Sequence, residues 1–432
     1  MAVTPRAAQA GNVTRRRLLR AAAALASTTL VACGRPGPSG GGPVQLYLQA
    51  PFDAALFGEM TPRFEAQNPG LRLNVAPAPK PGSASLAAAL VSGDGPDVFW
   101  DDDPARYLGT PLALDLSPLI TAGGYDLSDF GSAILAAYRY GGGLYMLPRS
   151  VSPSVYAART DIWAGAGLDL PTGAYTAAEL ADLWRRLSTA GRIIAGQVVW
   201  SPSSTFYLNG WGAHEVDPAD SARCALGAPA ALTCGQWMWD RFWLDGSAQG
   251  MQGQFANASF TAGTLAMQVV DCAGLPAFAA GAQSVPWRLV PFPTWPVRQA
   301  TAAAADFFAI SAASHHQEAA WRLLQFVCSP EWQQAAIGTL LVCPSRRSLW
   351  DQYVAQVPRI LPALKGQDIG LYAQPVQGDW ALPPEEFRHQ PAAEPLLQSY
   401  WMKIFGPGTT LGVGPGFAAL AAAIDTAEAA KA

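Results

Sequence analysis

The chain has 432 residues, of which half are apolar and 14% are charged, and its formal net charge is −4. This length allows two or three domains with sizeable cores, and the composition excludes a globally disordered chain. No basic patch interleaves with aromatic residues, which excludes nucleic acid as the expected partner, whereas the 15 tryptophans suit flat apolar ligand surfaces such as sugar faces.

The N-terminus has the layout of an export signal. Arginines at positions 6, 15–17 and 20 precede a short apolar run at 21–32, and no acidic residue occurs before Cys33. This run is too short to span a bilayer permanently.

Two motifs refine that signal. Residues 14–19, TRRRLL, resemble the twin-arginine signal for export of folded proteins, and residues 30–33, LVAC, resemble a lipobox, in which the cysteine is acylated. We therefore expect residues 1–32 to be a twin-arginine signal peptide of the lipoprotein type, with lipidation at Cys33. The general secretory route is the alternative for export.

A flexible tether is expected after the signal, because residues 33–43 read CGRPGPSGGGP. It would hold a folded protein at the outer face of a membrane through the lipid anchor. Removal of residues 1–32 takes away five arginines and no acids, leaving 23 basic and 32 acidic side chains. This acidic balance favours solubility and disfavours adhesion to anionic lipid.

From residue 44 the chain alternates strands with helices. Strands are predicted at Val44–Leu48, Leu71–Val75 and Asp97–Trp100, with helices at Ala54–Gln67 and Ser83–Ser92 between them. This order predicts an α/β fold with a doubly wound, mostly parallel sheet.

The middle and the end of the chain continue the alternation. Thr176 and Glu179 have capping-box spacing at a helix start, and Trp321, Leu324 and Phe326 are predicted to face a core. The further helices are predicted at Thr176–Ala190, Pro229–Phe242, Glu318–Val327 and Phe417–Ala430, and the further strands at Ile193–Trp200 and Leu265–Val270.

Candidate ligand contacts follow two of the strands. In open α/β sheets ligands bind outside the carboxyl ends of the strands. Gln49 and Asp53 follow the first strand, and Trp100, Asp101 and Asp103 follow the third. An indole stacks on the C–H face of a sugar, and a carboxylate accepts its hydroxyl groups, so these residues predict a sugar site.

Several segments, in this order and spacing, resemble the solute-binding proteins of bacterial ABC importers, in the carbohydrate-type family that includes maltose-binding protein. The resemblance implies two α/β lobes joined by a multi-segment hinge that closes on a ligand, with crossings near 149–156, 304–311 and 342–348. The segments are FEAQNPGLRLNV (64–75), LVSGDGPDVFW (90–100), LALDLSPLI (112–120), FTAGTLAM (260–267) and AAWRLLQFVCSPEWQ (319–333).

The resemblance also assigns the lobes and the partners. Lobe 1 would comprise 44–150 and 304–343, and lobe 2 would comprise 151–303 and 344–432. The implied function is that of an extracytoplasmic receptor, not an enzyme, which binds a sugar or oligosaccharide and delivers it to the membrane subunits of an ABC importer. We expect a monomer without cofactor or metal.

In the family, an aromatic residue and an acid just past the third strand contact the ligand, and Trp100 with the aspartates at 101–103 match that place. Trp200, Trp211 and Asp271 are the candidates from lobe 2, each following or near a strand end. The sequence departs from the family where Asp271 and the two residues after it replace a ligand-contacting tryptophan, which leaves the particular sugar open.

Six cysteines become five free to pair once Cys33 is lipidated, and export permits disulfides. Proximity in sequence favours Cys224–Cys234 and Cys328–Cys343, with Cys272 left as a free thiol. No Cys/His spacing predicts a zinc site.

Other functions fit parts of the pattern. The acids would also suit a receptor of the same fold for a polyamine, iron or a peptide. A secreted glycoside hydrolase would use Asp101 and Asp103 as acid and base, but two acids on one loop are poorly placed to flank a sugar ring. A calcium loop would need a glycine and a distal glutamate that are missing.

Overall fold

The structure is a computed structural model, and it describes residues 44–50, 54–77, 84–101, 104–188, 193–198, 205–250, 258–340 and 342–431. The predicted signal peptide, the tether and Cys33 lie outside the described residues. None of the described helices combines the length and the apolar character that a membrane span requires.

The first three strands form one parallel layer, as predicted. β1 (Val44–Ala50) lies between β2 (Leu71–Pro77) and β3 (Val98–Phe99) and pairs with both in parallel. The connections are helices α2 (Ala54–Gln67) and α3 (Ala84–Ser92). α2 begins and ends at the predicted residues. The pattern of its apolar residues and the Asn-Pro-Gly sequence after it are therefore sufficient to predict its bounds.

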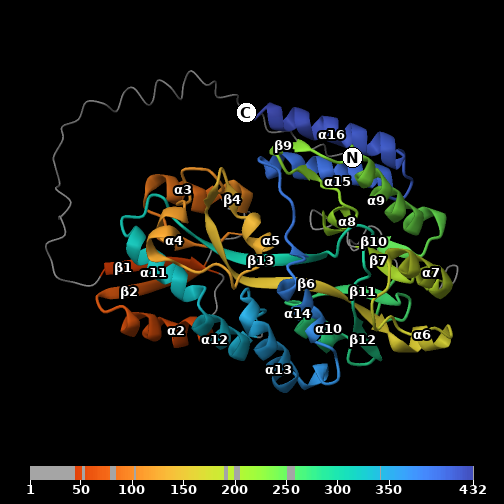
Figure 1. Cartoon of the computed structure of the whole chain (residues 1–432), viewed down its shortest axis with the longest axis horizontal. Coiled ribbons are helices and arrows are strands. Elements are labelled where there is room, and N and C mark those ends of the chain that lie inside the picture. The colour runs from red at the N-terminus through yellow and green to blue at the C-terminus, as the bar shows by residue number, and fades with distance from the viewer. Residues whose placement is uncertain are drawn as a thin grey trace, which may run out of the picture. The chain divides into compact units, whose positions relative to one another are not determined.

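Two long strands extend this sheet. β6 (Met146–Arg159) is buried at every position, and β13 (Thr301–Ile310) pairs with it and with β3 in antiparallel fashion. β11 (Met267–Asp271) and β12 (Trp287–Val290) pair with the far end of β6, so the strand order is β11-β6-β13-β3-β1-β2. In Figure 1, β6 and β13 run from the elements near α4 and α5 to those near β11.

The remaining elements are short strands, of which β14 also pairs with β13, and helices (Figure 1). The short strands are β4 (Arg139–Tyr140), β5 (Gly143–Leu144), β7 (Gly196–Val198), β8 (Val216–Asp217), β9 (Asp220–Cys224), β10 (Ala248–Gly250) and β14 (Ala381–Leu382). The helices of the first half are α4 (Ser117–Gly123), α5 (Ser132–Ala136), α6 (Thr160–Gly165), α7 (Ala177–Leu187), α8 (Thr205–Gly210) and α9 (Pro229–Trp239). Those of the second half are α10 (Leu275–Gly281), α11 (Gln317–Val327), α12 (Pro330–Leu340), α13 (Trp350–Ile360), α14 (Gly370–Gln377), α15 (Gln390–Phe405) and α16 (Val413–Ala429).

The buried apolar side chains separate into two clusters. The first cluster includes Trp321, Leu324 and Phe326, which confirms their predicted core role. Its other large members include Phe99, Phe308, Trp332 and Trp350. The second cluster includes Trp184, Tyr207, Trp295, Trp401 and Phe417. Most of the tryptophans therefore stabilise the fold through burial rather than face a ligand.

The start of α7 confirms the predicted capping box. The Thr176 side chain accepts a hydrogen bond from the Glu179 N–H at 3.2 Å, and the Glu179 carboxylate accepts one from the Thr176 N–H at 2.7 Å. The hydrogen bond from the Thr176 N–H, together with that from the Thr176 hydroxyl, lowers the pKa of Glu179. The helix ends at Leu187, before the predicted boundary.

Candidate functional site

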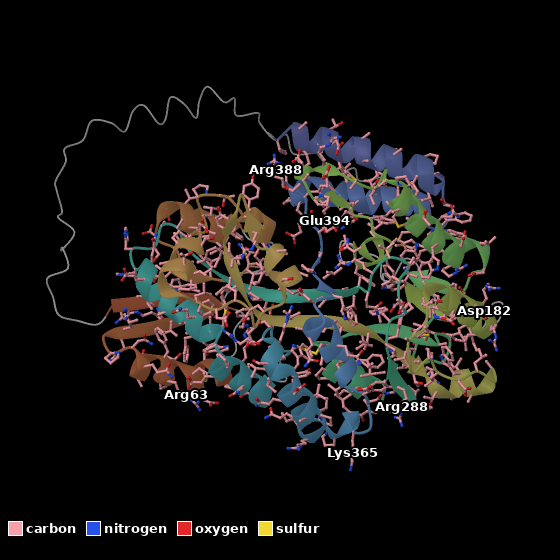
Figure 2. All side chains as sticks on the ribbon, in the orientation of Figure 1. Arg63, Asp182, Arg288, Lys365, Arg388 and Glu394 are labelled. Atoms are coloured by element: carbon pink, nitrogen blue, oxygen red, sulfur yellow. A yellow bond between two sulfur atoms is a disulfide. The ribbon has the colours of Figure 1, made fainter. Side chains whose placement is uncertain are left out.

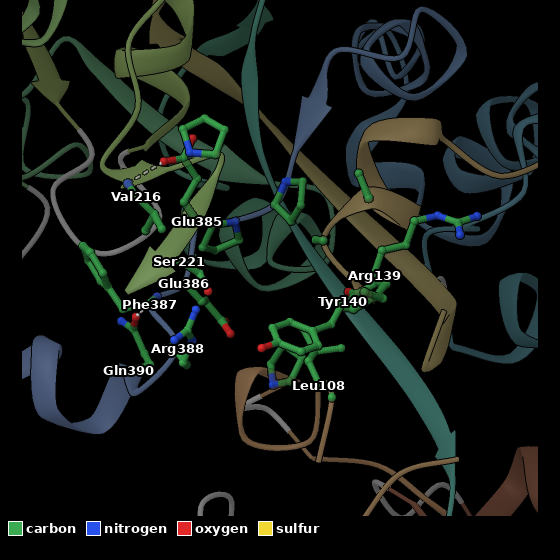
Figure 3. Close-up of a pocket in the computed structure, with 18 of the residues that line it drawn as sticks. Leu108, Arg139, Tyr140, Val216, Ser221, Glu385, Glu386, Phe387, Arg388 and Gln390 are labelled. Atoms are coloured by element: carbon green, nitrogen blue, oxygen red, sulfur yellow. Dashed lines mark hydrogen bonds between the residues drawn. The ribbon is translucent and has the colours of Figure 1, made fainter. Parts of the chain in front are cut away.

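A cleft of about 1400 Å³ lies between two sets of loops, with β13 at its floor. The first wall consists of segments around 104–110 and 133–141, and the second wall of segments around 214–221 and 382–392. Figure 3 shows the second wall, with Glu385, Glu386 and Arg388, opposite Leu108 and Tyr140 of the first. The two walls come from parts of the chain that are far apart in sequence.

The β4–β5 hairpin presents an aromatic ring to the cleft. Gly141 and Gly142 connect its strands with φ values of 55° and 88°, a conformation that favours glycine. Tyr140 is 42% exposed, and its ring packs directly on Gly109, where an added Cβ would lie 2.1 Å from the ring. Glycines therefore hold a large exposed ring against one wall of the cleft.

Two alanines and one phenylalanine of β13 form the floor of the cleft. Ala304, Ala305 and Phe307 of β13 line it, and a register shift follows Asp306. Asp306 is held by Arg149, whose guanidinium donates to it at 3.1 Å.

Polar and charged side chains also line both walls. Tyr138 of the first wall is buried, and burial, with a further contribution from the negative charge of Glu386, raises the pKa of its hydroxyl. On the second wall, Arg388 donates to Asp220 at 3.0 Å, and both side chains remain partly exposed. Figure 2 shows Arg388 at the segment that leads into α15. The cleft therefore offers both hydrogen-bond donors and acceptors to a ligand.

Glu385 accepts hydrogen bonds from four groups of the facing loop. Its carboxylate accepts from the amide of Asn209 at 2.7 Å and contacts Nδ1 of His214 at 2.6 Å. It also accepts from the N–H groups of Glu215 at 2.7 Å and Val216 at 3.0 Å. The hydrogen bond to Glu385 raises the pKa of His214. Glu385 thus ties the two segments of the second wall together.

Trp100 and Asp101 are not among the described residues that line the cleft. Trp100 is partly buried against the first cluster. Asp101 is 3% exposed and accepts a hydrogen bond from the Tyr107 hydroxyl at 2.5 Å. The segment after them continues into Pro104 and Arg106, which do line the cleft.

The two described candidates that were predicted in lobe 2, Trp211 and Asp271, do not line the cleft. Trp211 is 7% exposed and packs between Trp237 and Trp295, with ring centroids 5.2 and 5.3 Å away. Asp271 is exposed at the end of β11, and its Oδ1 accepts from Ser152 and from the Gly274 N–H. Neither is among the described residues that line the cleft.

The other candidates are described in part or not at all. The backbone of Gln49 pairs with Phe99, so the ends of β1 and β3 are neighbours, as the sheet prediction requires. Asp53, Asp103 and Trp200 lie outside the described residues. The sequence reasoning missed Tyr140 and Glu385, although the paired glycines after Tyr140 are a readable hairpin signal.

The predicted disulfides are wrong. Cys272, predicted to be free, is bonded to Cys343, and the cysteines at 224, 234 and 328 are free. The physical reason is β6: the Cys272 N–H donates to the carbonyl of Pro153, and the Cys343 carbonyl accepts from the N–H of Val151. The two cysteines therefore meet on one edge of that strand.

Two of the free cysteines, Cys224 and Cys234, pack in the second cluster, and the third lies in the first cluster. Cys234 is fully buried in α9 and belongs to the second cluster, whereas Cys328 belongs to the first. Burial raises the pKa of Cys224 and that of Cys328 to about 12 each. In the described part of the chain, no group of three or more His, Cys, Asp or Glu side chains could hold a metal ion.

The family description "Bacterial extracellular solute-binding protein" matches residues 41–334, well over half of the chain. The chain belongs to this family. Its members are extracellular binding proteins, which agrees with the resemblance found in the sequence. No curated protein matches the chain.

Solved structures with the same fold cover nearly the whole of this solute-binding protein. The sugar-binding protein MalE from Xanthomonas citri is 16% identical, with a TM-score of 0.72 over 90% of this chain and 98% of its own. The cyclic alpha-maltosyl-1,6-maltose binding protein from Arthrobacter globiformis is 18% identical, with a TM-score of 0.71 over 90% and 99%. UgpB from Mycobacterium tuberculosis, in complex with glycerophosphocholine, is 21% identical, with a TM-score of 0.67 over 91% and 100%. These similarities confirm the two-lobe α/β fold.

Proposed function

We propose that this protein binds a sugar or oligosaccharide in the cleft and delivers it, chemically unchanged, to the membrane subunits of an ABC importer. The exposed Tyr140 ring carries the proposal, because it offers a flat apolar surface opposite a wall with Glu386 and Arg388. A sugar has a matching C–H face and a rim of hydroxyl groups. The cleft volume, about 1400 Å³, exceeds that of a typical small-molecule pocket and suits an oligosaccharide.

The similar structures support a sugar and keep one alternative in view. Two of those described above are named for sugars, whereas UgpB holds glycerophosphocholine. A non-sugar solute, such as a polyamine, iron or a peptide, is therefore the second candidate. Hydrolysis of the sugar is not part of the proposal, since the predicted acid Asp101 is buried and bonded to Tyr107.

A thermal-shift screen of the mature protein tests the ligand class. A ligand that binds only the folded state raises the melting temperature by an amount that grows with its concentration. We expect shifts with sugars or oligosaccharides and none with polyamines, iron or peptides. If only one class of non-sugar solute raises the melting temperature, that class is the ligand and the sugar proposal is wrong, while the fold stands.

The sequence candidates near the strand ends complete the proposed site. The backbone of Gln49 pairs with Phe99 at the neighbouring ends of β1 and β3, Trp100 follows β3, and Pro104 lines the cleft. In the sequence, Asp53 and Asp103 follow the same two strands. We propose these residues as the deeper contacts of the first wall, with Trp200 on the second. Trp211 and Asp271 are weaker proposals, because each already has partners.

We also propose that the two lobes move about a hinge. The proposed lobes, 44–150 with 304–343 and 151–303 with 344–432, share β6 and β13, which pair along their length. Ligand is expected to close the cleft, and small-angle scattering would detect this as a smaller radius of gyration. An unchanged radius at saturating ligand would contradict the hinge.

Membrane tethering through Cys33 is a separate proposal with its own test. Replacing Cys33 with alanine removes the sulfur that would be acylated, so the variant is expected to leave the membrane fraction and appear in the soluble fraction. A control with Arg15 and Arg16 changed to lysine should instead block export if the twin-arginine route operates. Membrane retention of the Cys33→Ala variant would exclude lipidation at this residue.

A further inference from the structure

Behind Glu385 lies a second carboxyl group with no hydrogen-bond partner in the described part of the chain. Glu215 is 0% exposed, and neither of its side-chain oxygens has a partner. Its own backbone N–H donates to Glu385 at 2.7 Å, which places the Glu215 main chain against the Glu385 carboxylate. A buried carboxyl without partners is far more stable when neutral.

Three titratable groups therefore share one small region of the second wall. Burial raises the pKa of Glu215 well above its ordinary value of 4.5, and the charge of Glu385 adds to this effect. The hydrogen bond to Glu385 raises the pKa of His214 above 6.5. Burial therefore favours the neutral form of Glu215, and the hydrogen bond to Glu385 favours the protonated form of His214.

Other charged and titratable groups face this region from the elements packed around it. Arg298 lowers the pKa of His214 and Asp217 raises it. The groups near Glu215 are the Cys224 thiol, whose pKa the charge of Glu215 would raise, and Asp425 of α16, which accepts from the Cys224 N–H at 2.8 Å. Neither a thiol of raised pKa nor a carboxyl group supplies a positive charge that would stabilise an ionised Glu215.

We propose that Glu385, Glu215 and His214 form a proton-dependent clasp, which positions the second wall of the cleft and loosens as the pH rises. Glu385 and His214 border the cleft, and the clasp joins segments about 170 residues apart in sequence. When His214 loses its proton, the charge that pairs with Glu385 is lost. When Glu215 ionises, its buried negative charge is repelled by that of Glu385. The role of Glu215 is positioning: it acts through Glu385 and touches no ligand.

The direction of the pH effect follows from the two shifts. Glu215 and His214 both have raised pKa values while the clasp is formed. Each therefore binds protons more readily in the formed clasp than after the clasp has opened. Opening therefore releases protons, and it becomes easier above about pH 4.5 for Glu215 and above about pH 6.5 for His214. Release of one proton raises the opening equilibrium constant by up to about tenfold per pH unit.

Hydrogen exchange measured on the mature protein tests this clasp without any ligand. Peptides covering 209–216 and 382–390 are followed between pH 5 and 8, with rates corrected for the intrinsic pH dependence of exchange. In the wild type, the protection of both peptides is expected to fall together as the pH rises. Glu215→Gln keeps the shape of the side chain but cannot ionise, so it should remove most of this dependence and raise the melting temperature increasingly with pH.

Two further variants separate positioning from general stability. His214→Gln cannot carry a charge, and together with Glu215→Gln it should make protection independent of pH. Arg388→Gln removes an exposed ion pair with Asp220 on the same segment and should keep the wild-type pH profile. The proposal is overturned if wild-type protection of these peptides does not vary with pH, or if Glu215→Gln retains the full wild-type profile.

Discussion

Replacing Cys272 and Cys343 together by alanine is expected to lower the free energy of unfolding by about 4 kcal/mol. The two residues are 71 positions apart, and a cross-link that closes a loop of this length restricts the unfolded chain by about that amount in the chain-entropy description. Chemical denaturation of the oxidised wild type and the double variant would measure the difference.

The place of the disulfide adds a structural reason for this large effect. Cys272 directly follows β11, which covers one part of the β6 edge, and Cys343 pairs with the next part through Val151. The hydroxyl of Tyr353 contacts both sulfurs, at 3.1 and 3.5 Å. The cross-link therefore joins two segments that must keep their register on the strand shared by the proposed lobes.

A matched control uses a buried cysteine that forms no bond. Cys328→Ala also removes one buried sulfur near β6, but it leaves the disulfide intact, so its loss should be about 1–2 kcal/mol, within the usual range for a single substitution. Peptide mapping without reduction should recover 272 linked to 343. Equal losses for the control and the double variant, or a different linked pair, would show that this disulfide does not stabilise the native protein.

The cysteines also show where sequence reasoning stops. Proximity along the chain favoured partners ten and fifteen residues apart, yet the observed partners are 71 apart. Pairing depends on which backbones share an edge of β6, and that is a property of the whole sheet. No local spacing rule contains this information.

Local signals predicted several elements of the secondary structure correctly. α2 has its predicted bounds, and the capping box of α7 is present with both of its hydrogen bonds. The parallel pairing of β1, β2 and β3 follows from strand–helix alternation. These features depend on neighbouring residues or on general topology, so a single sequence is enough to predict them.

The wall segments were harder to predict because their roles depend on distant partners. Glu385 lies in the sequence LPPEEFRH, which reads as an ordinary polar loop. Only the fold brings it to His214 and to the buried Glu215. Trp211 was predicted to contact the ligand, but it belongs to the second cluster. An aromatic residue after a turn is as compatible with the core as with a ligand surface.

The sugar site makes the second large prediction, which concerns ligand affinity. Tyr140→Ala is expected to weaken binding of the sugar found in the screen by about 1–3 kcal/mol, which is roughly 5- to 150-fold in Kd. The side chain is exposed on a short hairpin, so its removal should change the melting temperature of the free protein little. Isothermal titration calorimetry would measure the affinity.

Three companion variants define what Tyr140 contributes. Tyr140→Phe keeps the ring and should bind nearly as well as the wild type, which separates stacking from hydroxyl bonding. Gly109→Ala should weaken binding as Tyr140→Ala does, because the added Cβ would lie 2.1 Å from the ring and displace it.

Trp100→Ala tests the strand-end loop instead. If Trp100→Ala abolishes binding while Tyr140→Ala leaves it unchanged, the sugar lies against the carboxyl ends of β1 and β3 and the hairpin is only a rim. If both variants weaken binding, the ligand extends from the strand ends to the hairpin, as an oligosaccharide in a cleft of this volume would.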